Sequence, residues 1–317
     1  MQQALDYKKR LQALEPNVVF LMSLYLHPSI TPETIEEAAR RGITGVKSYP
    51  AGVTTNSASG VLSYEPYYPV FEAMEKHNMI LNLHGEVPSE SKDHKDITVL
   101  NAEAAFLPQL EKLHKAFPKL RIILEHCTTA AAVATVEKCG PSVSATITAH
   151  HLWLIIDDWC GNPFNFCKPV AKTPEDRRAL LKAVVSGNPK FFFGSDSAPH
   201  PVSAKTGKGS TAAGCFTQGW TTQLVVGALQ RAQEKGLLED GLEVTQDTLE
   251  GFLGRFGRTF YRGPKDAFTY KQVPEPTGKI VLTRSGAKIQ EVVSSTNGDV
   301  QVVPFKGGDE TWSLEWA

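Results

Sequence analysis

The sequence has 317 residues, 41% of them hydrophobic, which is enough for one large domain with a buried core. Its 33 basic and 34 acidic residues are well mixed, so the net charge of −1 argues against a nucleic-acid or membrane surface and favours a small-molecule partner. Five scattered cysteines without a C-x-x-C pair indicate neither disulfides nor a thiolate zinc site, and the absence of a signal peptide or an apolar span predicts a cytoplasmic protein.

The apolar pattern predicts strands and helices that alternate along most of the chain. Residues 2–14 are expected to be helical with no strand before them, so the chain begins inside a helix. A strand is predicted within residues 17–26. Thr31 then supplies an N-cap, Pro32 a first helical position and Gly42 a stop for the next helix.

Five further strands are predicted along the chain, within residues 42–49, 79–84, 120–126, 142–148 and 191–196. Helices are predicted over residues 65–78, 98–117, 129–140, 174–187, 216–235 and 246–261. The short β-prone pieces after residue 268 do not form another βα unit. We therefore expect a β/α barrel domain over residues 1–267 and a C-terminal extension over residues 268–317 that packs on it.

Four of the predicted strands end in side chains that can bind a metal: Lys47, His84, His126 and Asp196. Singly, such a histidine is more often a hydrogen-bonded structural residue and such a lysine a surface charge, whereas such an aspartate is as often a turn residue as a site residue. In a parallel barrel, however, the strand ends meet at one mouth. Two imidazoles and a carboxylate are ordinary zinc ligands, and zinc with an open position activates water. Lys47 can join them only if it is neutral or modified to an anion.

Five segments, in chain order, resemble the class II, single-function dihydroorotases of the zinc-dependent amidohydrolase superfamily: GVKSYPAGVTTNS, LNLHGEV, ILEHCTT, SATIT and FFFGSDSAPH. The similarity runs over residues 7–261. It implies a (β/α)8 TIM barrel with two zinc ions at its mouth. Lys47 would be the carboxylated lysine that bridges both metals, His84 and His126 would bind the second metal, and Asp196 would bind the first metal and move the proton.

The resemblance also implies a substrate and its contacts. The enzyme would interconvert (S)-dihydroorotate and N-carbamoyl-L-aspartate in de novo pyrimidine biosynthesis, with a zinc-bound hydroxide as the nucleophile, and would be a homodimer. The substrate would be contacted by His84, by His200, which would bind its α-carboxylate, and by the backbone around Lys168 and Ala213, while a mobile loop with Thr54 and Thr55 would close over it.

The sequence departs from this family in one respect. It contains no H-x-H-x-R strand, whose histidines bind the first metal and whose arginine holds the substrate carboxylate, and no strand with the corresponding asparagine. His27 and the pair His150 and His151 follow other strands. The six strands would be the third to the eighth of the barrel. We expect a barrel with a gap at the position of the first two βα units, so that side chains of its interior contact water. We also expect little or no activity from these 317 residues alone.

Three interpretations stay open. The chain is a dihydroorotase with an incomplete sequence, or an inactive truncated barrel that acts as a binding or regulatory partner, or another cyclic-amide hydrolase of the hydantoinase kind. His200 and the Thr54 and Thr55 loop favour dihydroorotase over hydantoinase. An in-frame H-x-H-x-R in the genomic DNA upstream of Met1 would distinguish the first interpretation from the second.

Overall fold

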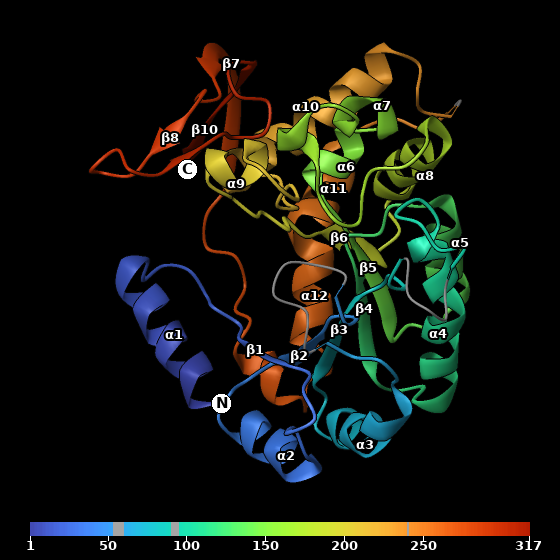
Figure 1. Ribbon diagram of the computed structural model, residues 1–317. Helices are drawn as coiled ribbons and strands as arrows, with labels where there is room; N and C mark the ends of the chain where they lie inside the picture. Colours follow the sequence, from blue (N-terminus) through green and yellow to red (C-terminus); the bar gives the residue numbers. More distant parts are fainter. Residues whose placement is uncertain (53–59, 90–94, 240) are drawn as a thin grey trace.

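The structure is a computed structural model that describes residues 1–52, 60–89, 95–239 and 241–317 (Figure 1). Its centre is a parallel sheet of six strands, each paired with the next one along the chain. The strands are β1 (Ser23–Tyr25), β2 (Gly45–Ser48), β3 (Ile80–His84), β4 (Arg121–Glu125), β5 (Val143–Ile147) and β6 (Phe191–Phe193). No other strand joins this sheet in the described ranges. The predicted order of six βα strands is confirmed.

The helices are α1 (Gln2–Leu14), α2 (Pro32–Arg40), α3 (Tyr68–Lys76), α4 (Ala102–Ala116), α5 (Ala130–Lys138), α6 (Ala149–Trp153), α7 (Ile156–Trp159), α8 (Pro174–Val185), α9 (Val202–Thr206), α10 (Thr221–Glu234), α11 (Gln246–Glu250) and α12 (Phe256–Arg262). The helices predicted from the apolar periodicity are present with adjusted ends, and the one predicted over residues 246–261 is divided into α11 and α12. The short helices α6, α7 and α9 were not predicted. One π-helical turn, Gly251–Arg255, joins α11 to α12, and short 3₁₀ turns cover Glu65–Tyr67, Pro163–Asn165, Gln218–Trp220 and Phe268–Lys271.

Two helix starts illustrate how local chemistry sets these ends. Thr31 caps α2 as predicted, because its hydroxyl accepts the backbone N–H of Thr34 at 3.3 Å. By contrast, α4 begins four residues later than expected. The side chain of Asn101 accepts the backbone N–H of Thr98 at 2.7 Å, which makes a turn of the residues before Ala102.

The outer face of the sheet packs against the helices and forms the main core. Along β3, alternate side chains such as Leu81 and Leu83 point into this core, together with Ile122 and Leu124 of β4. All five residues of β3 are buried, as expected for a strand covered on both faces.

The inner face of the sheet is covered by α12, which Figure 1 shows running along the strands. Ile80, Ile123 and Phe192 form a second buried cluster against the aromatic side chains of α12, and the rings of Phe192 and Phe260 lie 5.7 Å apart. The expectation that side chains inside an open sheet contact water is therefore wrong for this cluster. The reason is that α12, from a later part of the chain, supplies the missing apolar contacts.

The C-terminal extension contains the antiparallel pair β7 (Ile280–Lys288) and β10 (Glu310–Trp316) and the short pair β8 (Val293–Ser294) and β9 (Gln301–Val302). β10 packs against α10, and the backbone N–H of Phe305 donates to the carbonyl of Phe216 at 2.8 Å. These contacts tie the extension to the barrel. The domain boundary at residue 267 stays a prediction. Among the described helices, none combines the length and apolar character needed to cross a membrane.

Candidate active site

The C-terminal ends of β2, β3 and β4 carry a row of polar side chains on the inner face of the sheet. Lys47 pairs in register with Asn82, and His84 pairs with Glu125. Because side chains alternate along a strand, Asn82 and His84 point to the same side as Lys47 and Glu125. The sheet register therefore brings two of the predicted metal ligands to the same edge.

Glu125 is the partner of Lys47. The Lys47 ammonium forms an ion pair with one oxygen of Glu125, while the other oxygen accepts from the side-chain amide of Asn82 at 2.8 Å. The ammonium also lies 4.8 Å from the ring centre of Tyr49. Sequence reasoning missed Asn82 and Glu125, although their places two residues before His84 and one before His126 could have indicated both.

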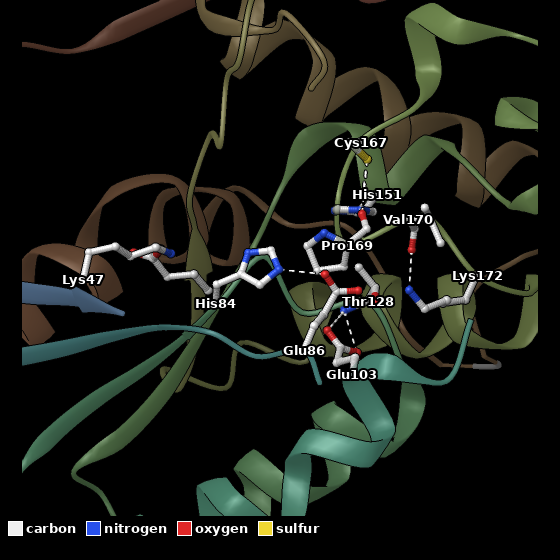
Figure 2. Close-up of polar contacts among 11 residues, drawn as sticks. Lys47, His84, Glu86, Glu103, Thr128, His151, Cys167, Pro169, Val170 and Lys172 are labelled. Atoms are coloured by element: carbon white, nitrogen blue, oxygen red, sulfur yellow. Dashed lines mark hydrogen bonds and ion pairs between the residues drawn. The ribbon is translucent and has the colours of Figure 1, made fainter. Parts of the chain in front are cut away.

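His84 and His126 lie together, with ring centres 4.6 Å apart and both side chains buried. The Nε2–H of His84 donates to Glu86 at 2.7 Å, as Figure 2 shows, which leaves Nδ1 as its free ligand atom. Burial lowers the pKa of His84 although Glu86 opposes it, and burial lowers the pKa of His126 well below its usual value, with the charges of His84 and Lys47 adding to the effect. Both rings are thus neutral, the form that binds metals.

His126 and Asp196 both follow their strands in left-handed backbone conformations, with φ of 44° and 40°. This region is unfavourable for residues other than glycine and is concentrated at functional sites. Gly194 lets this part of the chain approach Thr146, because a Cβ there would lie 2.7 Å from that of Thr146. The hydroxyl of Thr146 in turn accepts the backbone N–H of His126 at 2.7 Å.

The carboxyl group of Asp196 interacts with the charges of Lys47 and Glu125. Desolvation by the surrounding protein raises its pKa to about 7; Lys47 opposes this rise and Glu125 adds to it. Asp196 is nevertheless an exposed residue at the mouth of the sheet. A carboxylate with this pKa can accept and release a proton near neutral pH.

A buried network around Glu103 lies behind His126 and was not predicted from the sequence (Figure 2). Glu103 of α4 accepts the backbone N–H of Thr128 at 2.8 Å and the hydroxyl of Thr129 at 2.5 Å. Burial raises the pKa of Glu103, although the charge of Lys172 opposes the rise. Glu103 holds the segment that directly follows His126, so it fixes the position of a candidate ligand.

Two of the predicted substrate contacts, Lys168 and Ala213, line a cavity of about 730 Å³. His200 lies beside them, since its Nε2–H donates to the carbonyl of Ala213 at 3.0 Å. The structure thus brings His200, Lys168 and Ala213 together. Thr54 and Thr55 lie outside the described residues.

The side chains at this site are of the types that bind metals. His126 Nδ1 is buried without a hydrogen-bond partner among the described residues, and its ring centre lies 4.6 Å from that of His84. An orphaned imidazole nitrogen at the mouth of a parallel sheet is the feature expected of a metal ligand. The hydrogen bond from His84 to Glu86 is the type of carboxylate contact that orients metal-binding histidines.

Comparisons with known proteins agree with this geometry. The amidohydrolase family profile matches residues 4–203. Dihydroorotase of Saccharomyces cerevisiae is 47% identical over 100% of this chain and 85% of its own length, and probable dihydroorotase of Schizosaccharomyces pombe is 50% identical over 98% of this chain and 84% of its own length. The solved structure of the S. cerevisiae enzyme with 5-fluoroorotic acid has a TM-score of 0.86 and covers 99% of this chain and 85% of that one.

L-Hydantoinase of Arthrobacter aurescens has a TM-score of 0.68 but only 16% identity, over 97% of this chain and 71% of its own, and this similarity shows the fold alone. The barrel architecture of the superfamily is therefore shared with hydantoinases, whereas the high identity over nearly the full chain is shared with dihydroorotases. The chain belongs to the amidohydrolase family and, within it, to the dihydroorotases.

Proposed function

We propose that this protein is a dihydroorotase that interconverts (S)-dihydroorotate and N-carbamoyl-L-aspartate, a step of pyrimidine biosynthesis. Family membership supports the reaction class. The single structural observation that carries the proposal is the meeting of Lys47, His84, His126 and the polar mouth of the sheet. The cavity beside His200 is large enough for a small cyclic amide.

Two zinc ions are the metals we propose for this site. Lys47, carboxylated on its amine, would bridge them, His84 and His126 would hold one, and Asp196 would contribute to the other. When bound, zinc lowers the pKa of water and polarises an amide carbonyl. Glu86 is proposed to orient His84 through the hydrogen bond to its Nε2.

Asp196 is proposed as the proton carrier. Its pKa of about 7 allows the carboxylate to take a proton from the attacking water and deliver it to the ring nitrogen as the amide bond breaks. In the reverse direction the same group takes the proton from the carbamoyl nitrogen during ring closure. The backbone of Asp196 lies in the left-handed region, with φ of 40°, a strained conformation of the kind that is concentrated at functional sites.

Substrate orientation would come from the opposite side of the site. His200 and the backbone around Lys168 and Ala213 would hold the α-carboxylate, since they lie at one cavity. His84 would contact the substrate from the metal side, and the loop with Thr54 and Thr55 would close over it. A cytoplasmic homodimer is the assembly that we propose from the family resemblance.

The test follows ring opening of dihydroorotate and, separately, of hydantoin by zinc-loaded protein. Because the 317 residues contain no H-x-H-x-R, both reactions are measured on this chain alone and on the chain joined to an N-terminal segment that supplies such a strand. We expect turnover of dihydroorotate by the joined protein and little by the chain alone. Preferential turnover of hydantoin would favour the hydantoinase alternative. A folded, zinc-loaded joined protein that is inactive on both would favour the binding-partner alternative.

A further inference from the structure

A second cluster of metal-binding side chains lies outside the site described above. His150 and His151 in the first turn of α6 meet Cys167, which follows the 3₁₀ turn at Pro163–Asn165. One ligand atom from each residue lies within 4.8 Å of those of the other two, and all three residues are buried. We call these three residues the His-His-Cys cluster. None of them belongs to the proposed catalytic zinc ligands.

His150 has no hydrogen-bond partner for either ring nitrogen among the described residues, although its side chain is 0% exposed. Its ring centre lies 4.5 Å from that of His151 and 6.4 Å from that of Phe305. A fully buried imidazole with two unsatisfied nitrogens is unfavourable, because desolvation of both polar atoms is not offset. A cation that accepts the lone pair of one of these nitrogens would remove part of this penalty.

The two other members of the cluster, His151 and Cys167, donate hydrogen bonds to one carbonyl oxygen. The Nε2–H of His151 donates to the carbonyl of Pro169 at 2.9 Å, and the thiol of Cys167 donates to the same oxygen at 3.3 Å (Figure 2). His151 Nε2 and Cys167 Sγ are 3.6 Å apart. Ordinary Zn–N and Zn–S bond lengths at a tetrahedral angle place the two donor atoms about 3.6 Å apart. The spacing therefore already fits one shared cation.

The surroundings of the His-His-Cys cluster set the protonation states of His150 and Cys167. Burial lowers the pKa of His150 well below its usual value, and the charges of His151 and Lys205 act in the same direction, so the ring is neutral. The interaction with Cys215 and burial raise the pKa of Cys167 well above its usual value, so its proton leaves only when a cation replaces it. Thr148 Oγ1 lies 2.8 Å from His151 Nδ1 and can accept a hydrogen bond from Nδ1–H when Nδ1 carries the ring proton.

We propose that His150, His151 and Cys167 form a separate structural site for a thiophilic divalent cation of the zinc type. Binding converts the Cys167 thiol to a thiolate and releases one proton, while the proton of His151 moves from Nε2 to Nδ1, from which the N–H donates a hydrogen bond to Thr148 Oγ1. The cation ties α6 to the segment that contains Lys168. This inference is independent of the proposed function, because it does not involve the catalytic ligands.

The experiment titrates Co²⁺ into the metal-free 317-residue chain and records the near-ultraviolet spectrum. A thiolate ligand gives cobalt a sulfur-to-metal charge-transfer band, whereas the proposed catalytic ligands offer only nitrogen and oxygen. The variants are Cys167→Ser and His150→Ala, which change the cluster. The controls are Cys160→Ser, which removes an exposed thiol, and Asp196→Asn, which alters only the catalytic site.

We expect the wild-type chain to show the band with one equivalent of Co²⁺ and to release one proton per bound ion, and Zn²⁺ to abolish the band by displacement. Cys167→Ser should lose the band and His150→Ala should weaken cobalt binding at least tenfold, while both controls keep it. A wild-type chain without the band overturns the proposal outright, whether or not the variants fold. A band that persists in folded Cys167→Ser, or disappears in Cys160→Ser, also overturns it.

Discussion

Lys47 at the end of β2 forms an ion pair with Glu125 at the end of β4, across the intervening strand β3. The two side chains are mostly buried, with 13% and 25% of their surfaces exposed. This contact requires a positively charged lysine. A carboxylated Lys47 would be an anion and would be repelled by Glu125, so carboxylation and this ion pair exclude each other.

Replacing Glu125 with Gln should therefore favour metal loading. The change removes the charge that holds Lys47 as an ammonium but keeps a group that can contact Asn82. An ion pair of this exposure contributes about 1 kcal/mol, so we expect roughly a fivefold gain in zinc uptake at limiting bicarbonate. Zinc content by mass spectrometry is the measurement, with the exposed Glu111→Gln as control. Reduced zinc content in Glu125→Gln would show that Glu125 supports the metal site instead.

Asp196→Asn tests the proton carrier. We expect turnover of dihydroorotate by the zinc-loaded, H-x-H-x-R-containing protein to fall by about 10² to 10⁴, because an amide cannot accept the proton. The free energy of unfolding at pH 8 should not fall, since the substitution removes a carboxylate whose pKa is raised to about 7 in the fold. Steady-state kinetics and urea unfolding are compared with those of Asp157→Asn at the exposed surface of α7. Near-normal turnover would exclude Asp196 from proton transfer.

Glu103→Ala tests the buried network behind His126. The substitution leaves the backbone N–H of Thr128 and the hydroxyl of Thr129 without their acceptor in a buried site. We expect a loss of about 2 to 4 kcal/mol in the free energy of unfolding, measured by urea denaturation. Glu111→Ala, an exposed position on the same helix, should change it by less than about 0.5 kcal/mol. Equal effects of the two substitutions would mean that the network does not stabilise the fold.

His114→Gln tests a pH-dependent contact on the outer side of the barrel. His114 Nε2 accepts the backbone N–H of Gly140 at 2.9 Å, and burial together with the charge of Lys190 lowers the pKa of His114. The pKa of His114 in the folded protein therefore lies below its value of about 6.5 in the unfolded chain. As the pH falls below about 6.5, the unfolded chain takes up a proton more readily than the folded protein, so the free energy of unfolding decreases.

The glutamine variant can still accept the N–H of Gly140 but does not titrate. We expect it to lose less stability between pH 7 and pH 5 than the wild type, by about 1 kcal/mol or less, since the ring is only partly buried. Thermal unfolding across this pH range is the measurement, and the exposed His27→Gln should follow the wild-type profile. Parallel profiles for His114→Gln and the wild type would contradict the assignment.

Much of the framework follows from the sequence, because its signals are local. Thr31 and Pro32 mark a helix start through adjacent backbone groups, and buried apolar runs mark the strands. The sequence predicts Lys47, His84, His126 and Asp196 as ligands because parallel strands in chain order must bring their C-terminal ends to one edge. That rule needs only the strand positions, not the packing.

Tertiary structure alone decided which groups face one another. Glu125 neutralises Lys47 only because β2, β3 and β4 are neighbours in register, and α12 covers the inner sheet face only because residues far along the chain return to it. The cysteine spacing argued against a thiolate zinc site, yet the fold places Cys167 beside His150 and His151. A spacing pattern reports ligands from one short segment, whereas this cluster joins a helix start to a distant loop, and that contact is set by packing of the whole barrel.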